Sequence, residues 1–255
     1  MRNFAGIKVL NYLRKYQRYK ARKELRKTRE LWDLINDYLK KTESTGISWV
    51  DYNELYKAVR RVKPKSVLEL GQGSSTMVIA FALRENEKEG YPGKITAMEE
   101  LEKYLLIGQN LLPPAFKPFV NYVLSPWVDF EYEIFRGVRY SEVPDIDFDF
   151  VFVDGPLHTS PKDGQFCFDA DLIYILQRPV QSSPLSGLVD FRLSSSYVFQ
   201  KLLGKEKVKF NMVKELAFIE LVESKDLKSL TLEGNMEMLK RHGRLFGNSI
   251  LKLYQ

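Results

Sequence analysis

Apolar positions in the first part of the chain repeat at helical spacing. Residues 7–41 contain no Gly or Pro, and their apolar stripe is clearer from Leu25 onward. The half before Leu25 is crowded with Arg, Lys and Tyr. A polar break over 42–46 precedes a second amphipathic stretch, 49–62, which the pair Lys63-Pro64 ends. The pattern predicts one or two long helices followed by a shorter one.

From Ser66 the pattern changes to short apolar runs that alternate with helical segments. We predict strands at 67–70, 94–98, 120–124, 148–153 and 187–191, and further strands at 208–213, 216–222 and 250–254. The intervening helices are expected at 77–84, 101–112, 166–176 and 195–203. This alternation predicts an α/β fold with a doubly wound sheet. We place a basic helical extension at 1–46 and the main domain at 47–255.

A glycine turn follows the first predicted strand, in the sequence ELGQGSST over residues 69–76. Its two glycines allow a tight turn and a close approach of the backbone to a ligand, and ligands of doubly wound sheets bind at this edge. The hydroxyl residues after the glycines can cap a following helix. A dinucleotide-binding turn would have a third glycine in place of Thr76, and a Walker loop would have a lysine. The turn therefore predicts a ligand site of another kind.

Acidic strand ends complete a pattern that resembles the class I S-adenosylmethionine-dependent methyltransferases, nearest to the small-molecule and sugar O-methyltransferases. Their first motif, Glu-x-Gly-x-Gly, is matched by Glu69, Gly71 and Gly73. Glu99 ends the second strand, where that family holds the ribose hydroxyls, and Asp154 ends the fourth. The resemblance covers residues 48–255. It implies a Rossmann-like, mostly parallel seven-stranded sheet, with S-adenosylmethionine as the cofactor of the domain at 47–255.

The side chains suit this cofactor chemically. The Glu69 carboxylate, or the carbonyls around it, can hold the methionine ammonium, and backbone N–H groups at the helix start can hold the methionine carboxylate. Glu99 can accept hydrogen bonds from both ribose hydroxyls. An ordinary strand, turn and helix with an accidental acid is the alternative. The expected cofactor-binding residues are Glu69, Gly71, Gly73, Ser74, Ser75, Thr76, Glu99 and Asp154.

The candidates for catalysis follow the fourth strand, in the sequence DGPLH over residues 154–158. His158 is a candidate general base because imidazole titrates near neutrality, and a histidine of a surface loop is the alternative. Proteins of the resembled group often bind a divalent metal through the Asp of this segment. Asp154 and Asp190 are therefore candidate ligands of Mg²⁺ or another divalent cation. Phe191 stands where that group has a further acid or amide, which weakens the metal interpretation.

Aromatic residues gather over 127–140, after the third predicted strand. The adenine end of the cofactor would lie near this segment in the resembled family. Stacking of Trp127 on the adenine is one interpretation. Packing of Trp127 in the core is the favoured one.

Charge is unevenly distributed. The net charge is +6, but residues 1–41 hold 13 Lys/Arg and 4 Asp/Glu, a net of +9, which leaves −3 for the remainder. A helical lid or dimerisation arm is the favoured interpretation of the extension. A helix lying on an anionic membrane is the second, with Phe4, Ile7, Val9, Leu10 and Leu13 toward the lipid. Nucleic-acid binding is the third and least favoured.

Three features concern the compartment. Cys167 is the single cysteine, which excludes an internal disulfide. The sequence has no run of 18 apolar residues, and its first 20 residues lack the apolar core of a signal peptide. We therefore predict a cytoplasmic protein, peripheral at the inner membrane face if the extension binds lipid.

These observations favour an enzyme that transfers a methyl group from S-adenosylmethionine to a hydroxyl of a small molecule. The resemblance suggests a sugar or a surface-glycan intermediate as the acceptor. An RNA or protein methyltransferase that captures its substrate with the basic extension is one alternative, and a non-catalytic binding module is another. No Asn/Asp-Pro-Pro-Tyr/Phe tetrapeptide, the usual mark of methylation on base amino groups, follows the fourth strand. The sequence leaves the acceptor open, and also whether the chain forms a homo-oligomer.

Overall fold

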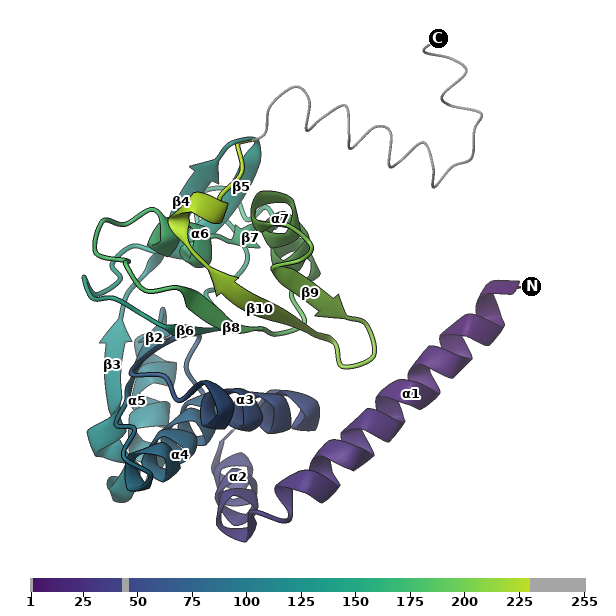
Figure 1. The fold of residues 1–255 in the computed structure, drawn as a ribbon, viewed down its shortest axis with the longest axis vertical. Coiled ribbons are helices and arrows are strands. Elements are labelled where there is room, and N and C mark those ends of the chain that lie inside the picture. The colour runs from purple at the N-terminus through teal and green to yellow at the C-terminus, as the bar shows by residue number, and fades with distance from the viewer. Residues whose placement is uncertain (1, 43–45, 230–255) are drawn as a thin grey trace.

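The computed structural model describes residues 2–42 and 46–229. At its centre is a seven-stranded sheet in the order β3-β2-β1-β6-β8-β10-β9 (Figure 1). Neighbours run parallel from β3 through β8, and β10 pairs antiparallel with β8 and β9. The strands are β1 (Ser66–Leu70), β2 (Lys94–Glu99), β3 (Val120–Leu124), β6 (Phe150–Val153), β8 (Leu185–Val189), β9 (Val208–Asn211) and β10 (Leu216–Val222). The mostly parallel seven-stranded sheet is confirmed, and the predicted strand at 250–254 lies outside the described residues.

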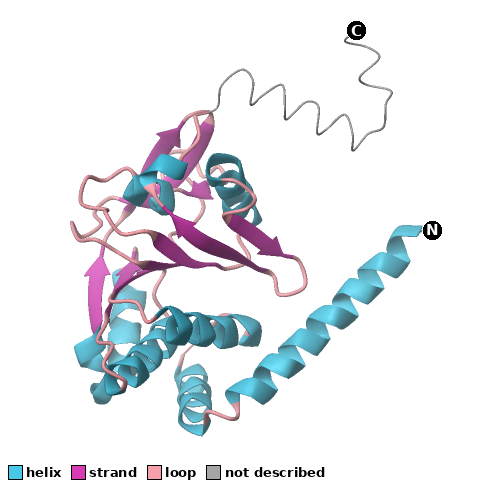
Figure 2. Ribbon diagram, viewed as in Figure 1, coloured by secondary structure: helices cyan, strands magenta, loops and turns pink. Residues whose placement is uncertain are grey.

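Helices cover both faces of this sheet (Figure 2). Successive strand residues point to opposite faces, so Val67 packs in one core with α2, α3 and α4, while Leu68 packs in a second core with α6 and α7. Two buried cores explain why the parallel strands are apolar almost throughout. The doubly wound architecture is therefore confirmed. The helices are α1 (Arg2–Leu25), α2 (Arg29–Lys41), α3 (Trp49–Val62), α4 (Ser74–Lys88), α5 (Glu102–Leu111), α6 (Asp171–Leu176) and α7 (Leu193–Leu203), with 3₁₀ turns η1 (Pro114–Phe119) and η2 (Ser224–Asp226).

A second, three-stranded sheet was not predicted. The aromatic segment forms a hairpin of β4 (Trp127–Tyr132) and β5 (Phe135–Tyr140), and β7 (Phe168–Asp169) adds to β5. The helix predicted at 166–176 is therefore wrong in its first part. The backbone at 168–169 pairs with β5, and the helix begins only at Asp171, whose carboxylate accepts a hydrogen bond from the Tyr140 N–H at 3.1 Å. The predicted strand at 187–191 lies two residues too late, since β8 ends at Val189.

The basic extension forms two helices that behave differently. α2 packs against α4, with Leu31, Ile35 and Tyr38 in the first core. α1 leaves the body at an angle and its far end stands apart from it (Figure 1). Within residues 2–42 and 46–229, no helix is long and apolar enough to cross a membrane. A domain boundary at residue 46 stays a prediction, since α2 shares the core of the main domain.

Candidate active site

The carboxyl ends of β1 and β6 meet at the centre of the sheet, where the glycine turn lies against the loop after β6. Gly71 has a φ of +86°, and a Cβ there would lie 2.7 Å from the Asp154 carbonyl oxygen. A Cβ on Gly155 would in turn lie 2.6 Å from the Gly71 Cα. Both the conformation and the space require glycine at residue 71. The first glycine of the motif therefore serves the fold by letting two loops touch.

The second glycine of the motif serves a different purpose. Gly73 has an extended backbone that any residue adopts, with φ at 176°. A Cβ at Gly73 would meet no atom within 4 Å. Nothing in the fold requires glycine at residue 73, and the space beside it is free at the start of α4. Because Gly73 has no side chain, an anionic group can come close to the backbone N–H groups at the start of α4.

The hydroxyl residues predicted to bind the cofactor are buried and used by the protein itself. Ser74, Ser75 and Thr76 are at most 4% exposed. The Ser74 Oγ lies 2.6 Å from the Tyr52 hydroxyl, and the Thr76 hydroxyl donates to Glu69 Oε2 at 2.6 Å and accepts from the Gly73 N–H at 3.1 Å. The Ser74 and Thr76 hydroxyls are thus already hydrogen-bonded within the protein and stabilise the turn. The groups left to bind a ligand here are the backbone N–H groups at the start of α4.

Glu69 ends β1 beneath the turn and is fully buried. Its Oε1 has no hydrogen-bond partner among the described residues, while Oε2 accepts from Thr76. Burial raises the pKa of Glu69 to about 8, the Ser75 and Thr76 hydroxyls act against the rise, and the charge of Glu99 adds to it. A buried carboxylate with a free oxygen is destabilised as an anion and is suited to a cationic ligand group.

Glu99 ends β2, the neighbour of β1, and is 5% exposed. Its Oε1 accepts a hydrogen bond from the Leu101 N–H at 3.0 Å. Burial and the adjacent Glu100 raise the pKa of Glu99 to about 7. The Gln72 N–H donates to the Met98 carbonyl at 2.9 Å, which joins the glycine turn to the end of β2. The structure thus brings Glu69, Glu99 and the glycine turn to one edge of the sheet, as predicted.

A cluster of carboxylates lies beyond the turn, at the ends of β6 and β8. Burial and the charge of Asp190 raise the pKa of Asp154 well above its ordinary value, while Arg192 acts against the rise. The Arg192 Nη2 lies 3.7 Å from Asp154 Oδ1 and donates to the Asp154 carbonyl. Asp51 of α3 completes the cluster: it is 2% exposed, and burial and Asp190 raise its pKa to about 7. Asp154 and Asp190 were predicted to be neighbours, whereas Asp51 was missed.

A buried network fixes Arg192 beside this cluster. Arg192 Nη1 donates to Asp169 Oδ1 at 2.5 Å and to the Pro156 carbonyl at 2.8 Å. Asp169 is fully buried and also accepts a hydrogen bond from the Ser195 hydroxyl at 2.5 Å. The guanidinium therefore connects β7, the loop after β6 and α7. Sequence reasoning missed the contacts of Asp169 with Arg192 and Ser195.

His158 stands at the rim of the site and not at its centre. It is exposed, and its ring stacks on Phe166 with the centroids 5.3 Å apart. Both rings line a cavity of about 290 Å³. The remaining lining residues are Asp169, Phe191, Arg192, Leu193 and Ser194. Arg192 lines this cavity and donates to the Asp154 carbonyl, and the same carbonyl lies against Gly71. The cavity is therefore next to the glycine turn.

Trp127 contributes to the position of the same loop. Its indole Nε1 donates to the Thr159 carbonyl at 2.8 Å, which ties β4 to the segment that carries His158. The side chain is half-buried. The described contact gives Trp127 a structural role, and stacking on an adenine stays a prediction.

Three features occur together: a seven-stranded sheet in which β10 runs antiparallel to both of its neighbours, a glycine turn after β1 and a buried acid at the end of β2. The fold is Rossmann-like. No family model matches the chain, and no curated protein matches it.

Several solved structures of methyltransferases are similar to this chain at low identity. An O-methyltransferase from Bacillus cereus in complex with SAH is 17% identical, with a TM-score of 0.41, over 62% of this chain and 66% of that one. The match therefore spans slightly less than two thirds of that protein. The O-methyltransferase TomG from Streptomyces achromogenes, in complex with SAM, is 14% identical over 74% of this chain and 89% of that one, with a TM-score of 0.46. A methyltransferase from Geobacter sulfurreducens is 11% identical over 76% and 90%, with a TM-score of 0.49.

The residues at the predicted metal site do not fit a divalent metal ion. Asp154 and Asp190 share their surroundings with the Arg192 guanidinium, which already supplies a positive charge. No group of three or more His, Cys, Asp or Glu side chains suited to a metal ion occurs in the part of the chain that the structure describes. The Arg192 guanidinium beside Asp154 opposes the binding of a divalent cation there by like charge. We therefore derive no catalytic step through a metal.

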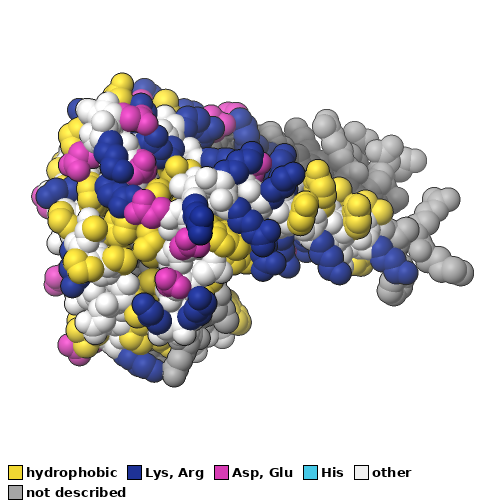
Figure 3. All heavy atoms as spheres, turned by 90° about the horizontal axis from the view of Figure 1, so that it is seen from below, with side chains coloured by type: hydrophobic (Ala, Val, Ile, Leu, Met, Phe, Trp, Pro, Cys, Tyr) yellow, Lys and Arg dark blue, Asp and Glu magenta, His cyan; other side chains and the backbone are white. Residues whose placement is uncertain are grey.

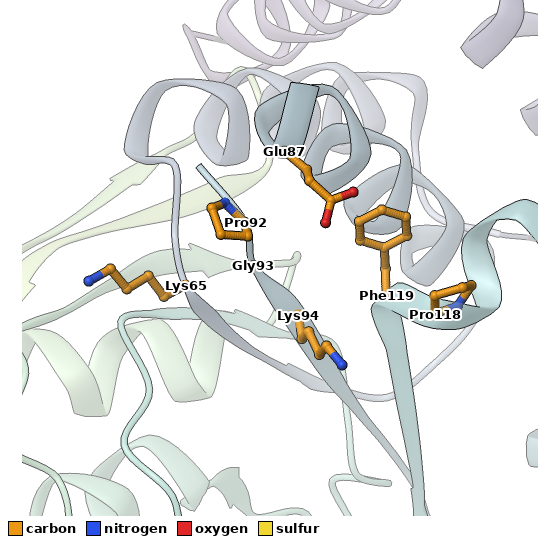
Figure 4. A pocket seen from close by; sticks show the side chains of 7 residues that line it. All are labelled: Lys65, Glu87, Pro92, Gly93, Lys94, Pro118 and Phe119. Carbon is orange, nitrogen blue, oxygen red and sulfur yellow. The ribbon is translucent and has the colours of Figure 1, made fainter. Parts of the chain in front are cut away.

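A second cavity lies at the opposite edge of the same sheet. It has a volume of about 540 Å³ and borders the residues that begin β1 and β2, among them Lys65, Gly93 and Lys94 (Figure 4). Ligands of doubly wound sheets bind at the carboxyl ends of the strands, and this cavity lies at the amino ends. It is larger than the cavity beside Arg192, but it is far from the glycine turn along the strands and is not the active site.

Proposed function

We propose that this chain transfers a methyl group from S-adenosylmethionine to a hydroxyl group of a small molecule. The observation that carries the proposal is the arrangement at one sheet edge. Two buried carboxylates, Glu69 and Glu99, flank a glycine turn whose second glycine borders free space, and an acceptor-sized cavity adjoins it. A chain without a cofactor has no need for two buried acids at adjacent strand ends, because each is costly to ionise there.

The residues present fit the proposed cofactor. Glu69, with its free Oε1, would hold the methionine ammonium, and the bare backbone at Gly73 with the start of α4 would hold the methionine carboxylate. Glu99 would accept the ribose hydroxyls, which stabilises its ionised form and offsets the cost of its burial. When bound, the cofactor supplies a methyl group on a sulfonium, whose charge is lost on transfer.

The acceptor site is the cavity beside Arg192. Its volume of about 290 Å³ is at the small end of the range for ligand pockets and suits a small acceptor better than a polymer. Phe166 and Phe191 provide aromatic faces, and Arg192 and Ser194 provide hydrogen-bond donors. Aromatic faces beside polar groups suit a sugar ring, which has an apolar C–H face and hydroxyl edges. A sugar or glycan intermediate is therefore our preferred acceptor class.

Asp154 is the residue that we assign to proton removal. Burial and the charge of Asp190 raise the pKa of Asp154 well above its ordinary value, which makes its carboxylate a stronger base than an exposed aspartate. Asp190 maintains this rise by like charge, and Arg192 limits it. His158 lies exposed at the rim of the cavity, so we assign it to the lining of the acceptor site together with Phe166.

A radiolabelled methyl-transfer assay against a panel of sugars, glycosides and phenols tests this function. We expect labelled product with at least one hydroxyl acceptor. Asp154→Asn should reduce kcat about 10²-fold or more. Asp145→Asn is the matched control, because Asp145 is an 88% exposed carboxylate on the surface. Transfer that stays unchanged in Asp154→Asn would remove it as the base, and cofactor binding without any transfer would contradict the enzymatic proposal.

A further inference from the structure

Two faces of α1 carry different chemistry. The face toward the body is held by arginines: Arg14 Nη1 and Arg18 Nη2 reach Glu215 at 3.1 and 3.0 Å, and the Arg22 guanidinium lies 5.0 Å from the centre of the Trp49 ring. These three arginines recur every fourth residue, so they form one side of the helix. The helix therefore has a fixed orientation relative to the β9–β10 turn and to α3.

The opposite face of α1 carries tyrosines that are more than half exposed. Val9, Tyr12, Tyr16 and Tyr19 are 58%, 70%, 52% and 63% exposed. At about 100° per residue, they fall within a stripe about 80° wide. Figure 3 shows hydrophobic and basic side chains side by side along this arm. Large apolar side chains in a continuous exposed stripe indicate a binding surface.

Lysines border the tyrosine stripe on both sides. Lys8 and Lys15 follow one border and Lys20 the other, and all three are exposed. Residues 2–23 contain eight Lys/Arg and no Asp or Glu. A second copy of this helix would bring the same cations against them, so the charge disfavours self-association through this stripe. An acidic surface is the complementary partner.

We propose that the tyrosine stripe of α1 binds the surface of an anionic lipid membrane. Tyrosine suits the membrane interface, because its ring lies among the acyl chains near the headgroups while its hydroxyl stays hydrated. Flanking lysines with apolar stems reach the lipid phosphates from both sides. The surface differs from the one predicted from sequence: its members are Val9, Tyr12, Tyr16 and Tyr19, whereas Arg14 and Arg18 of the intervening turns face the body.

Cosedimentation of the full chain with lipid vesicles tests the proposal. The vesicles are phosphatidylcholine alone or phosphatidylcholine with about 30% phosphatidylserine. We expect binding to the anionic vesicles only, with a loss of at least about tenfold in the partition coefficient when Lys8, Lys15 and Lys20 are all replaced by Gln. The matched charge control replaces Lys57, Lys117 and Lys205 by Gln, three exposed lysines of the body, and should keep the binding.

A second variant distinguishes binding through the tyrosine side chains from binding through positive charge alone. Tyr12→Ser/Tyr16→Ser/Tyr19→Ser keeps every lysine and should also lose at least about tenfold in partitioning. Tyr91→Ser, at a tyrosine 50% exposed on the body, is its control. The stripe is solvent-exposed, so an unchanged melting temperature is expected and is measured for each variant. Equal binding by the tyrosine variant, no binding by the intact chain, or a stripe-dependent dimer or RNA complex without vesicle binding would overturn the proposal.

Discussion

Glu69→Gln is the substitution for which the structure makes the most quantitative prediction. The side chain is fully buried, and its pKa rises from 4.5 to about 8 in the folded chain. The folded protein therefore binds one more proton than the unfolded chain between these values. The contribution of Glu69 to the free energy of unfolding is therefore greatest below pH 4.5 and falls as the pH rises toward 8. Glutamine keeps the shape and removes the titration.

The expected size follows from the same values. The rise in pKa from 4.5 to about 8, at about 1.36 kcal/mol per pKa unit, corresponds to a fall of about 5 kcal/mol in the free energy of unfolding of the parent chain across this pH window. Between pH 5.5 and 7.5 the parent should therefore lose about 1.4 kcal/mol per pH unit more than Glu69→Gln does. Glutamine can place its amide oxygen at the position of Oε2, so the Thr76 hydroxyl still has an acceptor.

Urea unfolding at intervals of half a pH unit from 5 to 8.5 measures this difference without cofactor. Glu99, whose pKa is also raised by burial, titrates in the same window and interacts with Glu69, so the same comparison is repeated in a Glu99→Gln background. Glu102→Gln serves as the control, since Glu102 is an exposed residue in the first turn of α5. Parallel pH profiles for the parent and Glu69→Gln would refute the claim that Glu69 is protonated in the folded, cofactor-free chain.

Three further predictions concern the turn, the metal and the buried arginine. Gly71→Ala should destabilise the fold by at least about 2 kcal/mol, whereas Gly73→Val should change stability by less than about 0.5 kcal/mol and weaken cofactor binding more than tenfold, as thermal melting and calorimetry can check. Methyl transfer should persist in excess chelator, because the carboxylates beside Arg192 do not fit a metal; complete loss with recovery on added Mg²⁺ would contradict this. Arg192→Met should cost about 3–5 kcal/mol in urea unfolding by leaving Asp169 buried and unpaired, and adding Asp169→Leu should recover part of that loss.

The sequence sufficed for the central sheet because its signals are local. The parallel strands are continuous apolar runs, and the turn at 71–73 lies between one of them and a helix. Glu69 and Glu99 could be assigned to one site because each ends a strand, and parallel strands end at the same edge. The start of α5 and the end of β8 were displaced by one or two residues, as is usual where helices and strands end.

The β4–β5 hairpin was missed because its turn lacks the usual residues. Tyr132 and Phe135 are joined by Glu133 and Ile134, and Glu133 adopts a φ of +53° without being Gly, Asn or Asp. The short strand β7 depends on pairing with β5 at Gly137, so it has no local signal either. Both features arise from contacts that only the folded chain makes.

The site residues that were missed come from elements far away in sequence. Asp51 lies on α3, before the sheet begins, and reaches the cluster only because α3 packs on α4. Asp169 and Arg192 are 23 residues apart and meet through β7 and α7. His158 was a candidate because imidazole titrates near neutrality, and its catalytic role stays a prediction; the rise in the pKa of Asp154 comes from burial and the charge of Asp190 in the folded chain. Such shifts depend on tertiary surroundings and leave no sequence motif.

Calorimetric titration of the purified chain with S-adenosylmethionine tests the central claim most directly. We predict saturable binding of one cofactor per chain, weakened about tenfold or more by Glu99→Gln and unchanged in the exposed control Glu102→Gln. Binding at neutral pH should also release protons, because the bound ammonium favours the ionised form of Glu69. No binding heat at about millimolar cofactor in buffers of different ionisation enthalpy, or an affinity that Glu99→Gln leaves unchanged, would contradict the account.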